Sequence, residues 1–391
     1  MGGPRWWRVD PAGSLLSRPA VATIVAWLVL GCEGRVGLGV PVPAPAGVDA
    51  PAATVGSEAD ARPTVVAPSA ASRAVALPAS RPALDLDAAI TVAALERDVE
   101  TLAADTLGGR ATPSPGLDAA ADIVASRFRE LGLASPPGID DYRQRFECGG
   151  AFRPGEAANV LAWRPGRDAD APAVIVSAHY DHIGSRPGKP DPVFNGANDN
   201  ASGVAAMLAI AKVVADLDPP PARSVLFAAF CGEELGLKGS TYFAEHAPVA
   251  LDAAVAGINL EMLGRADPKV PGQIWVTGYD YSTLPALAAE ANDGRGVSFV
   301  SSAEIGPAEA DAFDRSDNYP LARQGVVAHT FSAGSLDDYY HAANDEADTM
   351  DFVAMAPLVR GLARVVVALA DGARAPTWTA AGRGAGFSAR E

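Results

Sequence analysis

Apolar stretches typical of buried strands alternate with helical stretches through most of this chain, and this alternation limits the folds open to it. The apolar stretches are 173–179, 224–230, 254–263, 273–278 and 326–334. The helical stretches are 88–105, 116–133, 202–217, 283–292 and 355–371. Such an alternation predicts an α/β protein with three layers, α/β/α, and a mixed, mostly parallel central sheet covered by helices on both faces.

Side chains that bind metals follow these predicted strands. In open α/β sheets, ligands bind beyond the carboxyl ends of the strands, so residues at those ends are expected to share one site. The candidates are His179, Asp199, Glu233, Glu234, Glu261 and His341. Imidazole and carboxylate donors suit zinc and other first-row divalent ions. They are too many for one catalytic zinc, so the set favours two ions bridged by a carboxylate.

Two adjacent carboxylates, Glu233 and Glu234, end the apolar stretch 224–230. Successive strand residues point to opposite faces, so neighbours can share a site only where the strand has ended. Gly232 gives the backbone that freedom. One glutamate can then bind metal while the other handles protons.

The motifs "AHYDH", "NGANDNASG", "CGEELGLKGS", "NLEMLG", "RSDNYPLARQG" and "YYHAANDEAD" occur in an order and spacing that resembles one enzyme family. This family is the co-catalytic zinc exopeptidases related to bacterial leucyl aminopeptidase, a superfamily that includes glutamate carboxypeptidase and transferrin-receptor-like proteins. The resemblance covers roughly residues 90–370 and implies the zinc-exopeptidase architecture and two zinc ions.

Residue roles follow from the resemblance, position by position. His179, Asp199 and Glu261 would hold one zinc, and Asp199, Glu234 and His341 the other, with Asp199 bridging. Glu233 would be the general base, and Asp181 would orient the His179 imidazole. The Asp199–Asn200 peptide is expected to be cis, as in relatives. His182 is either a neighbour of the ligands or part of the pocket wall.

Three positions depart from the pattern of this family. Glu261 stands where aspartate is common, Asn318 where histidine is common, and Phe313 where some aminopeptidases have a tyrosine that steadies the oxyanion. Tyr339 and Tyr340 are therefore candidates for that donor.

Both ends of the chain read as segments outside the folded domain. Residues 1–32 have the basic and apolar parts of an export signal, and "LVLGC" resembles a lipoprotein box with Cys32 as the lipid-bearing residue. An ordinary cleaved signal peptide is the alternative. Residues 33–85, rich in alanine and proline, predict a disordered tether, 86–372 the peptidase domain, and 373–391 a flexible tail. Cys148 and Cys231 could pair in an oxidising compartment or remain buried thiols.

The sequence predicts an exported aminopeptidase, facing the periplasm or cell surface or secreted, that hydrolyses amino-terminal residues from peptides by means of a metal-bridging hydroxide. A formal net charge of −16 disfavours a nucleic-acid partner. The alternatives are a single-zinc glutaminyl cyclase, a non-catalytic binding domain, and a carboxypeptidase. The last needs a cation for the substrate carboxylate, for which Arg265, Arg315 and Arg323 are candidates.

Overall fold

The computed structural model describes residues 84–148, 155–168, 170–310, 312–372 and 374–389, and their centre is a mixed β-sheet. Its strand order is β1-β2-β4-β3-β5-β8-β6-β7. The strands are β1 (Arg143–Cys148), β2 (Gly155–Arg164), β3 (Val174–His179), β4 (Val225–Phe230), β5 (Ala256–Leu260), β6 (Gln273–Val276), β7 (Ser298–Ser301) and β8 (Ala328–Ser332). The central strands β4, β3, β5 and β8 pair in parallel, as do β6 and β7, whereas β1–β2, β2–β4 and β6–β8 are antiparallel.

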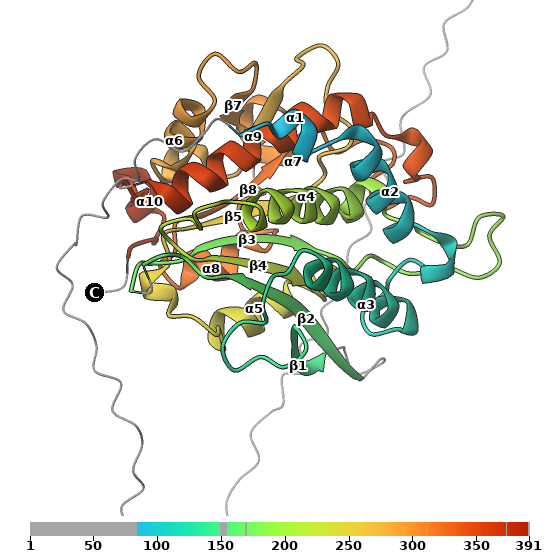
Figure 1. Cartoon of the computed structure of the whole chain (residues 1–391). Coiled ribbons are helices and arrows are strands. Elements are labelled where there is room, and N and C mark those ends of the chain that lie inside the picture. The colour runs from blue at the N-terminus through green and yellow to red at the C-terminus, as the bar shows by residue number, and fades with distance from the viewer. Residues whose placement is uncertain (1–83, 149–154, 169, 311, 373, 390–391) are drawn as a thin grey trace, which may run out of the picture. The chain divides into compact units, whose positions relative to one another are not determined.

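Helices cover both faces of the sheet (Figure 1). They are α1 (Leu86–Ala89), α2 (Val92–Leu102), α3 (Pro115–Glu130), α4 (Gly203–Ala215), α5 (Lys238–Glu245), α6 (Leu284–Ala291), α7 (Pro307–Ala310), α8 (Asn318–Arg323), α9 (Phe352–Asp371) and α10 (Ala380–Gly384). Along β4, Phe227 joins the large core that includes residues of α3, α4 and α9. The next residue, Ala228, joins a smaller core with Phe243 of α5 and Leu321 of α8. The three-layer α/β/α architecture predicted from the sequence is confirmed.

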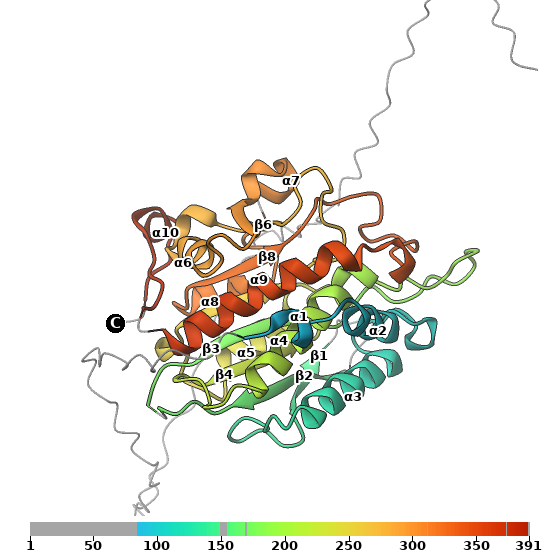
Figure 2. The same cartoon turned by 45° about the horizontal axis from the view of Figure 1, so that its top comes forward.

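Helix α9 is apolar because it lies in the core. By length and composition it is the one helix in the described ranges that could cross a membrane, but most of it is buried. It runs beside α4 in both views (Figure 2) and also contacts α2 and α6. Apolar residues therefore surround it on several sides, as expected of a core helix in an α/β protein.

Several elements differ from the sequence-based expectation. Strands β1, β2 and β7 were not predicted, and β1 and β2 form the antiparallel edge of the sheet. The helical stretch 88–105 is divided into α1 and α2, because Thr91 is extended and its hydroxyl caps the N-terminus of α2.

The C-terminal segment corrects a prediction. Residues 374–389 are not a flexible tail where the structure describes them, because α10 docks on the 3₁₀ turn Tyr279–Tyr281. Trp378 and Phe387 are both buried, and the Trp378 indole N–H donates to the Gly325 carbonyl at 3.1 Å. Two aromatic anchors in this short segment supply the apolar area that holds it in place.

The predictions for the N-terminal region concern residues that the structure does not describe. The export signal over 1–32, the lipid-bearing Cys32 and nearly all of the tether over 33–85 lie outside the described ranges. They remain predictions.

Candidate metal centre

His179 is the last residue of β3, and the chain after it supplies a carboxylate that faces its ring. The Asp181 Oδ1 lies 3.7 Å from His179 Nδ1, and Asp181 Oδ2 accepts a hydrogen bond from the Thr112 hydroxyl at 2.9 Å. Both His179 and Asp181 are almost completely buried. The predicted role of Asp181 as the group that orients His179 is compatible with this geometry.

Asp199 lies in a tight π-helical turn, Ala197–Ser202, between β3 and α4. The Asp199–Asn200 peptide bond is cis, as expected. Asn200 fixes the turn against the end of β5, because its side-chain amide donates to the Leu260 carbonyl and its oxygen accepts the Met262 N–H. The turn therefore places Asp199 between the ends of β3 and β5.

Glu233 and Glu234 follow β4 after Gly232, whose φ of 70° is in the left-handed region. The Glu233 backbone N–H donates to Asp181 Oδ1 at 3.2 Å. The two side chains then diverge: Glu234 Oε2 lies 3.1 Å from His341 Nε2, whereas Glu233 has no ion pair among the described residues. After β4 the chain thus directs Glu234 towards His341 and leaves Glu233 without such a partner, which is compatible with the different roles predicted for the two carboxylates.

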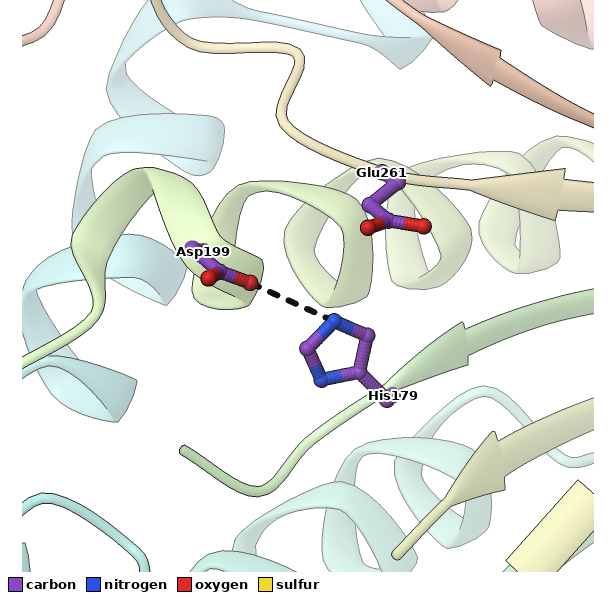
Figure 3. Close-up of side chains that lie close together, drawn as sticks. All are labelled: His179, Asp199 and Glu261. Atoms are coloured by element: carbon purple, nitrogen blue, oxygen red, sulfur yellow. Dashed lines mark ion pairs between the residues drawn. The ribbon is translucent and has the colours of Figure 1, made fainter. Parts of the chain in front are cut away.

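Two groups of potential metal ligands share Asp199. The first is His179, Asp199 and Glu261, whose donor atoms lie within 4.8 Å of one another. Figure 3 shows these three side chains converging from the end of β3, the π-helical turn and the residue after β5. The second group is His182, Asp199 and Glu234.

His341 reaches the second group from the loop after β8. Its Nε2 lies 3.3 Å from Asp199 Oδ2, so the predicted ligands His179, Asp199, Glu234, Glu261 and His341 are all brought together. The structure also adds His182, whose Nδ1 lies 2.9 Å from Glu234 Oε1. The sequence left His182 open between a neighbour of the ligands and the pocket wall, and the structure places its ring beside Glu234 and Asp199.

The surroundings of the carboxylates in this site shift their pKa values in opposite directions. Burial raises the pKa of Glu233 well above its usual value, and the neighbouring carboxylates Glu261, Asp317 and Glu234 raise it further. Burial alone would raise the pKa of Asp199 as well, but the imidazoles of His179 and His341, whose Nε2 atoms lie 3.3 Å from its two oxygens, lower it well below its usual value. Burial also raises the pKa of Glu261, to about 7, but Glu261 belongs to a group of potential metal ligands and Glu233 does not, so Glu233 is the carboxylate left to take up a proton.

Buried polar atoms without hydrogen-bond partners gather at this site, and their chemistry fits a metal centre. Four buried side-chain atoms at the site lack a hydrogen-bond partner in the described part of the chain: His179 Nε2, His182 Nδ1, His182 Nε2 and Glu234 Oε1. Buried polar atoms without partners are costly. Imidazole nitrogens and carboxylate oxygens that point at one another without good hydrogen bonds are the donor set that divalent cations bind.

Sequence reasoning assigned no role to two residues that hold this site together. Arg110 is buried, and its guanidinium donates to the carbonyls of Tyr180, Asn195 and Gly196, on either side of the site. Asp345 accepts the backbone N–H groups of Asn198 and Asp199 and forms an ion pair with Arg265. Both act through backbone groups of distant segments, for which a sequence carries no signal.

A pocket opens from the metal centre, and one of the two candidate oxyanion donors lines it. Its wall includes Tyr340, whose hydroxyl has no hydrogen-bond partner among the described residues. Burial raises the pKa of Tyr340, which keeps the phenol protonated at neutral pH. Tyr339 instead places its ring 4.3 Å from the Arg265 guanidinium. Phe313 is buried among other aromatic rings, including Tyr281 and Phe387.

Two of the arginines considered for a substrate carboxylate lie elsewhere. Arg265 is engaged by Asp345 and Thr349, and Arg323 is at the exposed end of α8. Of the three, Arg315 alone lines the pocket.

The fold and the site define an α/β protein with a carboxylate–imidazole centre at the carboxyl edge of its sheet. Residues 159–366 match the peptidase family M28, and the chain belongs to this family. The resemblance to zinc exopeptidases seen in the sequence is thereby confirmed.

Individual relatives agree with this assignment. The chain is 28% identical over 296 residues to leupeptin-inactivating enzyme 1 of Streptomyces exfoliatus, covering 74% of this chain and 58% of that protein. It is 27% identical over 205 residues to aminopeptidase YwaD of Bacillus subtilis, covering 51% of this chain and 41% of the relative. The chain thus spans less than two thirds of the length of these relatives.

Solved structures share the fold at low sequence identity. The zinc aminopeptidase BSAP from Bacillus subtilis superposes with a TM-score of 0.57 at 16% identity, covering 71% of this chain and 94% of that one. The glutaminyl cyclase of Porphyromonas gingivalis gives a TM-score of 0.56 at 18% identity, covering 72% and 99%. The fold alone therefore does not separate these two activities.

Proposed function

We propose that this protein is an exported zinc-dependent aminopeptidase that removes amino-terminal residues from peptides. The observation that carries the proposal is that Asp199 belongs to two groups of ligands while Glu233, beside them, belongs to neither. A bridging carboxylate suits a pair of ions. The names of the relatives YwaD and BSAP, an aminopeptidase and a zinc aminopeptidase, support zinc and this activity.

In this proposal His179, Asp199 and Glu261 hold one ion, and Asp199, Glu234 and His341 hold the other, with His182 beside the second. Bound zinc ions would supply Lewis acidity that activates water and polarises the scissile carbonyl. Glu233 takes a proton from the attacking water and passes it to the leaving amine. Tyr340 donates its hydroxyl hydrogen to the oxygen that becomes negative. The acidic side chains around the site attract the free amine of the substrate.

Export as a lipoprotein through Cys32 is part of the proposal and rests on the sequence of residues 1–32 alone. Labelling of the chain with a radioactive fatty acid in a bacterial host tests it. Loss of the label in a Cys32→Ala variant is expected, and an unlabelled wild-type chain would favour an ordinary cleaved signal.

The direct test of the proposed function is metal analysis combined with a substrate panel. Two zinc ions per chain and cleavage of aminoacyl amides, abolished when the amine is acetylated, are expected. One ion per chain with cyclisation of amino-terminal glutamine would instead identify a cyclase. A Glu233→Gln variant should bind metal as the wild type does but lose about 10²–10⁴-fold in kcat. Turnover near the wild-type rate would show that the base is another group.

A carboxypeptidase is the second candidate, because Arg315 lines the pocket with no ion-pair partner among the described residues. Acetylated peptides that are trimmed from the carboxyl end, with the activity lost in Arg315→Gln, would favour it.

A further inference from the structure

The pocket that opens from the metal centre contains a carboxylate that the proposed reaction does not use. The same cavity is lined by Asp199, Glu233 and Glu261 and also by Glu309 of α7. A substrate whose scissile carbonyl lies at the metal centre would extend its amino-terminal side chain into this space. In that pose the pocket would hold the side chain of the first residue of the substrate.

The Glu309 side chain is fixed by one hydrogen bond and has no cationic partner among the described residues. It is 4% exposed, and its Oε1 accepts the backbone N–H of Leu336 at 2.8 Å. Its Oε2 has no hydrogen bond or ion pair within the described residues. Oε2 packs close to Gly306, where a Cβ would lie 2.7 Å from this oxygen. A buried carboxylate with a single hydrogen bond is costly, and a cation relieves that cost.

The rest of the pocket wall suits an aliphatic stem. Trp275, Leu336 and Ala312 contribute apolar surface. The polar edge of Trp275 is already satisfied, since its indole N–H donates to the Gly334 carbonyl at 2.8 Å. Long basic side chains bury their methylene groups along apolar surface and direct the charge to the tip.

We propose that Glu309 determines specificity and selects substrates whose amino-terminal residue has a cationic side chain, lysine or arginine. The inference rests on the proposed aminopeptidase function and deepens it. Arg315 also lines the pocket, but it is exposed whereas Glu309 is buried. A charge in the low-dielectric wall acts more strongly on the substrate than a solvated one.

The rival explanation is that Glu309 only fastens the loop at Leu336. A Glu309→Gln variant separates the two roles, because the glutamine oxygen can still accept the Leu336 N–H while the charge is lost. Glu304→Gln is the matched control: Glu304 is exposed in the preceding turn, where it accepts the Ser301 N–H. It does not line the pocket.

The experiment measures kcat/KM for lysyl, arginyl, norleucyl and glutamyl amides in the three proteins. Wild type and Glu304→Gln should prefer the lysyl and arginyl amides to the norleucyl amide, which has an unbranched side chain but no charge. In Glu309→Gln, kcat/KM for the basic substrates should fall by about 10- to 100-fold while that for the norleucyl amide stays unchanged. An unchanged preference in Glu309→Gln, or a wild-type preference for the glutamyl amide, would overturn the proposal.

A binding measurement keeps this test independent of turnover. Calorimetric titration, with lysinamide and norleucinamide, of zinc-loaded proteins that also carry Glu233→Gln, so that the amides are not hydrolysed, should show tighter binding of lysinamide when Glu309 is present and no preference when Glu309→Gln is added. If lysinamide is preferred but no amide is cleaved, the specificity proposal stands and the aminopeptidase proposal fails. If norleucyl amide is cleaved as well as lysyl amide, and binding shows no preference, the function stands and the role of Glu309 is wrong.

Discussion

The carboxylate of Asp345 accepts the backbone N–H of Asp199 at 3.0 Å, and its other oxygen accepts the N–H of Asn198 at 2.9 Å. Asp345 is 1% exposed, and Arg265 balances its charge. Asp199, the residue predicted to bridge two ions, is therefore held in position through its backbone by Asp345, which belongs to the loop after β8. The same loop carries His341, so one loop supplies both a candidate ligand and the support for Asp199.

An Asp345→Asn variant should bind zinc about 10- to 100-fold more weakly, because a carboxamide can accept only one of the two N–H groups and leaves Arg265 without a counter-charge. Competition with a chromophoric chelator measures the affinity. Asp348→Asn, at an exposed position in the same loop, is the control. Equal affinity in the two variants would show that the turn at Asp199 holds its shape without Asp345.

A Tyr340→Phe variant tests the oxyanion donor. Tyr340 lines the pocket and its ring stacks on His341 at 4.0 Å between centroids, so removal of the oxygen should leave the packing intact. Loss of one such donor costs on the order of 10²–10³-fold in kcat with little change in KM. Tyr339→Phe, whose ring faces Arg265, should retain activity. A wild-type kcat in Tyr340→Phe would place the donor elsewhere.

Gly232 should be sensitive to substitution for two separable reasons. Its φ of 70° costs any other residue about 1–2 kcal/mol. A Cβ there would also lie 3.0 Å from Lys238 Cβ and 3.2 Å from Cys148 Sγ, and this crowding would shift Glu233. Gly236 has a φ of 87°, but a Cβ on it would meet no atom within 4 Å, so Gly236→Ala carries the strain alone.

Urea unfolding and steady-state kinetics on the two alanine variants should therefore diverge. Both should lose stability, but only Gly232→Ala should lose turnover beyond about tenfold, because a small displacement of a catalytic base is costly. Full activity in Gly232→Ala would mean that the Glu233 side chain adjusts to the shift.

The buried His329, which lies away from the metal centre, should make the stability of the fold depend on pH. Burial lowers its pKa from 6.5 to about 4, against an opposing hydrogen bond to the Thr277 carbonyl at 2.6 Å. Its Nε2 faces the Ser282 hydroxyl at 2.7 Å. The unfolded chain takes up the proton more readily than the folded one. The free energy of unfolding is therefore undiminished above pH 6.5, where the histidine is neutral in both states. It loses about 3 kcal/mol as the pH falls towards 4.

The measurement compares the unfolding free energies of wild type and His329→Asn between about pH 7 and pH 4, the range over which the histidine of the unfolded chain takes up its proton. The asparagine amide can still donate to Thr277 but does not titrate, so the difference between the two proteins should shrink by that amount as the pH falls. A constant difference for His329→Asn would mean that the histidine takes up its proton in the folded state as readily as in the unfolded chain.

The sequence predicted the parts of this molecule that depend on local pattern. The central strands, α4 and α9 follow from continuous apolar runs, and the candidate ligands His179, Asp199 and Glu261 follow from their places at or after the ends of strands. It did not predict β1 and β2, which are defined by pairing with each other and with β4. Nor did it predict Asp345, because a carboxylate that binds backbone groups 146 residues away has no local pattern.

The C-terminal segment was misjudged for a related reason, and it gives a last prediction. Glycine and alanine suggested a tail, but Trp378 is 5% exposed and lies against Phe387 and His329, with centroid distances of 5.2 and 5.9 Å. Truncation of a buried tryptophan typically costs about 3–5 kcal/mol, so Trp378→Ala should lower the unfolding free energy by this amount in urea. Ser388→Ala, at an exposed position, should change it little.

The same variant should also alter the pH dependence, because Trp378 is one of the groups that keep water from His329. With the indole gone, the pKa of His329 should move back towards its usual value, and the loss of stability between pH 6.5 and about 4 should become smaller. A Trp378→Ala protein that is nearly as stable as wild type and keeps the wild-type pH profile would show that residues 374–389 do not pack on the domain in solution.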